Sequence, residues 1–207
     1  MKKFFFGLLF AVILHGISAA QISERHPHQN WDSMLLNPES GRAVGRAITL
    51  SESQTMALTL DFPAGHCAKP ALGLLVISRG NSQARNISGT LQVNIDNRAP
   101  HILPATCTFL GEIATIYLGL DYDDAIINEL KRGGQIETNF HAIGQPVIQA
   151  EFSLWGMGAA YSTAQNLCLA QPVPTNPMPD RTIAPYLDDD ARYFPSPLTN
   201  TSGGITR

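Results

Sequence analysis

The sequence predicts an α+β domain in which a mostly antiparallel β-sheet, or a compact β-sandwich, of about six strands is covered by two short helices. Three observations predict this class. Several segments alternate apolar and polar residues with a period of two, as half-buried strands do. Two other segments have helical spacing and helix end signals. A short turn, Gly144-Gln145-Pro146, between two alternating segments is typical of an antiparallel hairpin.

The chain begins with a pattern typical of a secretory signal peptide. Lys2 and Lys3 precede an apolar run at 4–14, and small residues follow at 18–20. The alternative, a membrane anchor, is disfavoured because the apolar run is too short to span a bilayer stably. We therefore expect residues 1–20 to be removed and a periplasmic or secreted chain to begin near Gln21, with no membrane insertion after cleavage.

The charge of the mature chain argues against polyanionic partners. Loss of the two lysines of the leader leaves 12 of the 14 basic residues against 17 acidic residues, a net charge of about −5. Nucleic acid or an anionic membrane surface would require clustered Lys and Arg, and the sequence has no such cluster. We expect a protein partner and no nucleic acid.

Residues 21–45 are polar and rich in turn formers, so we expect an irregular N-terminal lead with Trp31 as its anchor, followed by one domain at 46–170. A break at 79–82, Arg-Gly-Asn-Ser, separates two of the strands predicted early in that domain. The predicted strands of this half are 55–62, 72–78, 91–96 and 113–118.

The second half of the domain contains both helices. Segment 121–134 has acidic residues at its start, Lys131 and Arg132 in its last turn, and a Gly-Gly stop. A hairpin of strands at 136–142 and 148–154 follows. After Gly156, which permits a sharp exit, the apolar residues take helical spacing as far as Cys168. We expect this helix to cover one face of the sheet.

From Gln171 the composition changes to a proline-rich tail, 171–207, that we expect to be extended and disordered. Within it, 183–194 alternates aromatic and acidic residues with apolar ones, like a linear docking motif. The alternative is a solvated tail without a partner. The candidate binding residues are Tyr186, Leu187, Asp188, Asp189, Asp190, Tyr193 and Phe194.

Three cysteines allow three disulfide pairings in an oxidising compartment. Cys67–Cys107 is favoured because both residues lie next to loop signals. Cys168 falls on the apolar stripe of its helix, where a thiol usually behaves as a small buried hydrophobe.

Catalytic and metal-binding patterns are missing from the sequence. His66, His101 and His141 are scattered without ligand spacing, and no nucleophile elbow, Cys-x-x-Cys pair or glycine-rich phosphate loop occurs. We expect no cofactor, no metal and no enzymatic activity. A hydrolase whose site is assembled through space remains an alternative, and it would require two of these histidines in one pocket with a carboxylate.

The hairpin and the helix after it, 151-EFSLWGMGAAYSTAQNLC-168, resemble the C-terminal half of periplasmic proteins from bacterial secretion and virulence loci. The type VI secretion-associated VasI-like proteins are the first resemblance, and the invasion-associated locus B family is the second. The resemblance covers about residues 55–168. The matching positions are Phe152, Leu154, Gly156, Met157, Ala160 and Cys168.

These families have no catalytic residues, so the resemblance implies a binding or accessory role. The leading hypothesis is a non-enzymatic protein-binding accessory factor of a bacterial secretion or envelope system. Its contact surfaces would be an exposed sheet edge and the tail motif. The alternative is a periplasmic immunity or inhibitor protein that plugs a toxic enzyme, with the segment Asn97 to Thr106 as a protruding plug.

Overall fold

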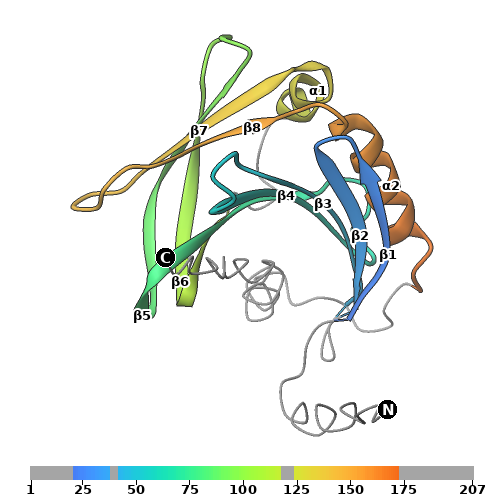
Figure 1. Cartoon of the computed structure of the whole chain (residues 1–207), viewed down its shortest axis with the longest axis horizontal. Coiled ribbons are helices and arrows are strands. Elements are labelled where there is room, and N and C mark those ends of the chain that lie inside the picture. The colour runs from blue at the N-terminus through green and yellow to red at the C-terminus, as the bar shows by residue number, and fades with distance from the viewer. Residues whose placement is uncertain (1–20, 38–41, 118–123, 173–207) are drawn as a thin grey trace, which may run out of the picture.

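The computed structural model describes residues 21–37, 42–117 and 124–172. This part of the chain forms one eight-stranded antiparallel sheet and two helices, of 9 and 13 residues (Figure 1). The expected α+β domain of about six strands was wrong, because strands dominate the fold. The strand residues that were not predicted lie in the N-terminal lead and in two strands, β5 (Ala71–Ile95) and β6 (His101–Tyr117), that are far longer than their apolar runs.

The strands run in the order β1-β2-β3-β4-β5-β7-β8, and β6 pairs with the other side of β5. Their bounds are β1 Gln21–His28, β2 Trp31–Asn37, β3 Val44–Leu50, β4 Met56–Pro63, β5 Ala71–Ile95, β6 His101–Tyr117, β7 Gln135–His141 and β8 Ile148–Ser153. The helices are α1 Asp124–Arg132 and α2 Met157–Leu169.

The predicted irregular lead is wrong where the structure describes it, because β1 and β2 form a hairpin within 21–37. Trp31 is the anchor that the sequence indicated, with only 1% of its surface exposed. Its Nε1 donates a hydrogen bond of 2.9 Å to the carbonyl oxygen of Ser153, 122 residues away. The pairing of β2 with β3 and this distant contact hold the lead in the sheet, and neither partner could be recognised from the composition of 21–45.

β5 replaces the two short strands that were expected on either side of 79–82. The strand is continuous, but its register against β6 shifts between Ile77 and Ser82 and again between Ser82 and Arg85. Its first part pairs with β4 and its last part with β7. The turn signals therefore produce irregularities within one strand. β5 joins two arms of the sheet, a first arm of β1–β4 and a second arm of β7 and β8.

α2 covers one face of the first arm, as the sequence predicted. Gly45 of β3 lies against the backbone of Ala164, so closely that a Cβ on Gly45 would overlap the Ala164 carbonyl oxygen. Tyr161 packs edge-on against Phe62 of β4, with 5.0 Å between the ring centroids. The helix begins after Gly156, whose φ of 93° lies in the left-handed region that favours glycine. The buried stripe of α2 is Met157, Ala160, Tyr161, Ala164, Leu167 and Cys168.

α1 also matches its prediction, because its inward residues are buried as expected: Ile126, Ile127 and Leu130. The two helices meet where Lys131 Nζ lies 3.4 Å from the ring centroid of Tyr161. Both helices therefore contribute to the main core, which also contains the inner residues of β4, β5, β7 and β8.

The disulfide joins Cys67 to Cys168, so the predicted Cys67–Cys107 pair is wrong. The Cα atoms of Cys67 and Cys168 are 5.7 Å apart because α2 lies across β4 and brings its last turn to the end of that strand. Cys107 lies on β6 and is buried in the core. Cys168 does lie on the apolar stripe of α2, as the sequence indicated, but it forms the disulfide there and is not a free buried thiol.

The leader and most of the tail lie outside the described residues. The expected signal peptide at 1–20 and the expected disorder at 173–207 are therefore not addressed by the structure. Among the described residues, no helix is long and apolar enough to cross a membrane.

Candidate functional site

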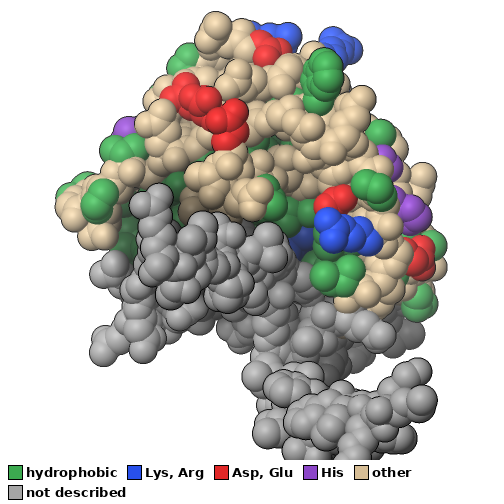
Figure 2. Space-filling view, in the orientation of Figure 1, with side chains coloured by type: hydrophobic (Ala, Val, Ile, Leu, Met, Phe, Trp, Pro, Cys, Tyr) green, Lys and Arg blue, Asp and Glu red, His purple; other side chains and the backbone are tan. Residues whose placement is uncertain are grey.

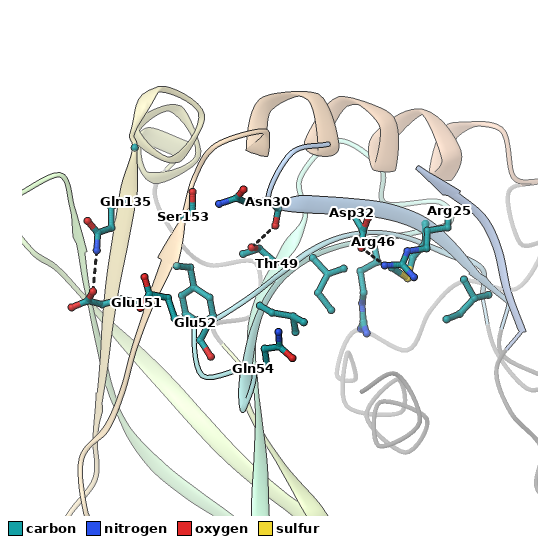
Figure 3. Close-up of a pocket in the computed structure, with 17 residues that line it drawn as sticks. Arg25, Asn30, Asp32, Arg46, Thr49, Glu52, Gln54, Gln135, Glu151 and Ser153 are labelled. Carbon is teal, nitrogen blue, oxygen red and sulfur yellow. Dashed lines mark hydrogen bonds and ion pairs between the residues drawn. The ribbon is translucent and has the colours of Figure 1, made fainter. Parts of the chain in front are cut away.

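A groove of about 850 Å³ lies between the first arm of the sheet and strand β8 (Figure 3). It opens on the face of β1–β3 that is turned away from α2, and the β3–β4 loop and the β7–β8 pair complete its wall. The lining residues are Ile22, Arg25, Asn30, Asp32, Met34, Arg46, Ile48, Thr49, Leu50, Ser51, Glu52, Gln54, Gly134, Gln135, Glu151, Phe152 and Ser153.

Strand alternation places both Arg46 and a small apolar cluster on the face that is turned away from α2. Gly45 faces α2, so its neighbours Val44 and Arg46 point to the opposite side of the sheet. Register then sets Met34 of β2 beside Arg46. Met34, Leu36 and Val44 form a second buried cluster, separate from the main core, against which Ile48 packs. Met34 and Ile48 thus form apolar wall beside Arg46, whereas most of the other lining residues are polar or charged.

Behind this wall, Arg46 pairs with Asp61 of β4, which lies directly opposite it in the β3–β4 register. Arg46 Nε donates to one carboxylate oxygen and Nη2 to the other, both at 2.7 Å, and both side chains are almost fully buried. Such a two-point pair fixes the arginine in one orientation. Toward the rim, Arg25 of β1 donates to Asp32 of β2.

Strand β8 presents an open edge to this groove. Leu154 N donates to Gly134 O at 2.9 Å, and Thr138 Oγ1 donates to Ala150 O at 3.2 Å, so these residues of the segment direct backbone groups toward β7. Because inward and outward residues alternate, Gln149 and Glu151 direct their N–H and C=O groups away from β7. No strand of the described part pairs with that side of β8.

At one end of β8, the backbone groups of the open edge are already hydrogen-bonded. Ser153 O accepts from Trp31 Nε1, and Asn30 N donates to Trp155 O at 3.2 Å, so the end of β8 is bonded to the start of β2. Toward the hairpin tip, β8 and the first arm diverge (Figure 1). The outward backbone groups of Gln149 and Glu151 lie on the diverging part of β8.

The other two edges of the sheet carry features that hinder pairing, and β8 does not. The β1–β2 register shifts between Ser23 and His26, and Pro27 removes a donor from β1. Pro104 does the same for β6. β8 pairs with β7 in unbroken register and contains no proline. β8 is therefore the edge best suited to accept another strand.

Exposed apolar side chains flank this edge at both ends. Ile143 and Val147 at the hairpin tip are 101% and 52% exposed, and Trp155 after β8 is 67% exposed. They give a partner apolar area to bury in addition to backbone hydrogen bonds.

The charges of the groove are separated along its length. Arg25 lies at the β1 end, and Glu52 and Glu151 lie at the β8 end (Figure 3). In the space-filling view, acidic side chains gather over β7 and β8 (Figure 2). Glu151 accepts from the Gln135 side chain and Glu137 from that of Gln149, so amides hold these carboxylates without neutralising them.

The sites predicted from the sequence do not coincide with this groove among the residues that the structure describes. The tail motif from Tyr186 to Phe194 lies outside the described residues. The proposed plug is wrong, because His101–Thr106 is paired within β6 and does not protrude as a loop. His66, His101 and His141 do not line the groove, and His101 instead contacts Glu129 of α1 at 3.2 Å. The described residues contain no cluster of three potential metal ligands.

The groove itself was not identified from the sequence. The general expectation of an exposed sheet edge was the closest signal, and it did not distinguish β8 from the other edges. β8 can be distinguished from the other edges only with the strand register of both arms and the hydrogen bond between Trp31 and Ser153.

Comparisons with known proteins give two weak similarities. No family model matches the chain. Dihydroxy-acid dehydratases from two strains of Bifidobacterium longum are 26% identical over 170 residues, and the chain spans about 26% of their length. The crystal structure of invasion associated protein B from Bartonella henselae is similar with a TM-score of 0.47 and 14% identity, over 70% of this chain and 98% of that one. Neither similarity shows that the chain belongs to a family.

Proposed function

We propose that the protein is a non-enzymatic, protein-binding accessory factor of a bacterial secretion or envelope system. It binds an extended segment of its partner along the open edge of β8. The observation that carries the proposal is the pair of outward-facing backbone units at Gln149 and Glu151, on an edge that borders a groove of about 850 Å³.

A segment of the partner would bind by β-strand addition, in which an extended peptide joins an exposed sheet edge. Its backbone would pair with Gln149 and Glu151, and every second side chain would point toward the groove wall. Met34, Ile48 and Leu50 supply apolar surface in the groove wall. Arg25, Glu52 and Glu151 supply charged groups at its two ends. Main-chain bonds would give affinity, and the wall would give specificity.

The extracytoplasmic setting is supported by two independent features. The start of the chain has the pattern of a secretory signal peptide. The Cys67–Cys168 disulfide would form and persist in an oxidising compartment and would be unusual in the cytosol. The resemblance of 151–168 to periplasmic secretion and virulence proteins agrees with both.

A proline scan of β8 tests the proposal. The mature chain would first be used to capture a partner from host envelope extract, and binding of the purified partner would then be measured. Gln149→Pro removes an outward N–H and should weaken binding at least about tenfold, or about 1.4 kcal/mol. Gln149→Ala keeps that N–H and should bind within about twofold of wild type. Equal affinity of the two variants would refute strand addition at β8.

A stability measurement completes the test. Because the N–H of Gln149 points away from β7, Gln149→Pro should leave the melting temperature nearly unchanged. Ala150→Pro removes an N–H that is directed toward β7 and should lower it clearly. If the two proline variants melt alike, the assignment of inward and outward residues is wrong.

A further inference from the structure

We infer that the groove also receives a segment of this same chain, the aromatic and acidic stretch 186–194, which adds to the edge of β8 as a ninth strand. This inference goes beyond the proposed function, because it holds whether or not a partner protein uses the groove. It would make the tail a competitor for any partner at that site.

The chain leaves the described part of the molecule beside β1 and β2, on the α2 face of the sheet, and must pass around the β1 edge to reach the groove. α2 ends at Leu169 and packs against β1 and β2, the strands that form one end of the groove (Figure 1). The described residues end at Pro172, and thirteen residues separate it from Tyr186. At about 3.3 Å per extended residue, that length reaches roughly 40 Å, which exceeds the roughly 15 Å that separate the outer strands of a four-stranded arm.

Proline positions select the stretch within the tail. The prolines at 172, 174, 177, 179, 185, 195 and 197 cannot donate to a strand ladder. They leave nine consecutive residues, 186-YLDDDARYF-194, with every backbone N–H available. Another proline-free run, 198–207, is as long but contains no aromatic residue and no acidic residue. Only 186–194 combines a complete backbone donor set with large side chains.

The side chains of this stretch complement the wall of the groove. Arg25 is exposed on 65% of its side chain, and its bond to Asp32 leaves guanidinium donors that Asp188–Asp190 can accept. Glu52 and Glu151 form no ion pair within the described residues, and Arg192 supplies the opposite charge. Charges of both signs on the segment thus meet charges of both signs along the groove.

The apolar side chains have matching surface as well. Ile22 and Leu50 line the groove and are 46% and 37% exposed, so each retains apolar area to bury. Tyr186 and Phe194 lie an even number of residues apart, so on a strand they project from the same face. Burial of one such ring contributes about 1.5–3 kcal/mol, before the loss of chain entropy is counted.

Hydrogen exchange on the full mature chain tests the inference without any partner. In wild type, the outward amides of Gln149 and Glu151 in β8 and the amides of 186–194 should exchange at least about tenfold more slowly than those of an unstructured chain. The variant Tyr186→Asp/Phe194→Asp should lose protection at both places. The matched variant Thr199→Asp/Ile205→Asp, which adds the same charge outside the stretch, should keep it.

A second variant confirms which edge is used. Gln149→Pro, which removes an outward N–H of β8, should raise exchange in 186–194. Wild-type exchange of 186–194 at the rate of an unstructured peptide would overturn the inference, as would protection that survives both Gln149→Pro and the Tyr186→Asp/Phe194→Asp change. The affinity measurements on Gln149→Pro and Gln149→Ala decide partner binding separately, and Tyr186→Asp/Phe194→Asp should strengthen that binding because it releases the competing tail.

Discussion

Replacing both Cys67 and Cys168 with alanine should lower the free energy of unfolding by several kcal/mol. The bond between them links residues 101 positions apart in the sequence. A cross-link of this kind acts mainly on the unfolded chain, because it prevents the two residues from separating and so reduces the number of conformations available. The longer the closed loop, the larger this reduction becomes.

The size of the effect follows from that separation. For a loop of 101 residues, the chain-entropy relation gives a loss of roughly 16 cal/mol/K, or about 4.7 kcal/mol at 25 °C. Measured values for native disulfides usually fall at 2–5 kcal/mol. We therefore expect the alanine pair to lose about 2–5 kcal/mol, a large part of the stability of a domain of this size.

Denaturant unfolding of the mature protein, with and without a thiol reductant, measures this effect. Cys107→Ala serves as the control, because it keeps the Cys67–Cys168 bridge and should still be destabilised by reductant. An alanine pair that unfolds within about 0.5 kcal/mol of wild type would refute the reasoning. Peptide mapping of the unreduced protein gives a direct check, and a Cys67–Cys107 linked peptide would contradict the structure.

Two further predictions concern α2. Gly45→Ala should cost about 1–3 kcal/mol in denaturant unfolding, because the added Cβ would overlap the backbone of Ala164. Gly158→Ala meets open space within the helix and should be neutral or add about 0.5 kcal/mol, and equal losses for both would contradict the packing. Burial, and then the charge of Asp124, raise the pKa of Tyr161 above its ordinary value of 10.0. Since the folded state favours the neutral phenol, its contribution to stability is present below pH 10 and lost as the pH rises through the higher folded pKa. The difference in absorbance titration between wild type and Tyr161→Phe should therefore have its midpoint above 10, and a midpoint at or below 10 would reject this.

The elements with strong local patterns were predictable from the sequence. α1, α2 and the β7–β8 hairpin all form where periodicity and end signals placed them. Gly156 is an example of why this succeeds, because its left-handed φ is a local requirement that the residue type itself reveals. β4 also lies within one residue of its predicted bounds, since Leu58, Leu60 and Phe62 alternate with polar or small residues.

The remaining features depend on contacts between distant parts of the chain. Trp31 is held by Ser153, and no pattern within 21–45 encodes that partner. Cys67 meets Cys168 only because α2 crosses β4, so the loop signals near Cys107 were misleading. The groove has the same origin, since it exists only where the second arm of the sheet approaches the first. Local sequence indicates faces and ends, and it does not indicate which edges face each other.

The position of the disulfide has a mechanical consequence. Cys168 lies in the last turn of α2, four residues before the end of the described chain at Pro172. A pulling force applied through the tail would reach this covalent bond before it could unwind the preceding turns of the helix. The load would then pass to Cys67, four residues after Pro63 at the end of β4. A protein tethered or towed by its C-terminal segment would thus bear the tension on its sheet while α2 stayed folded.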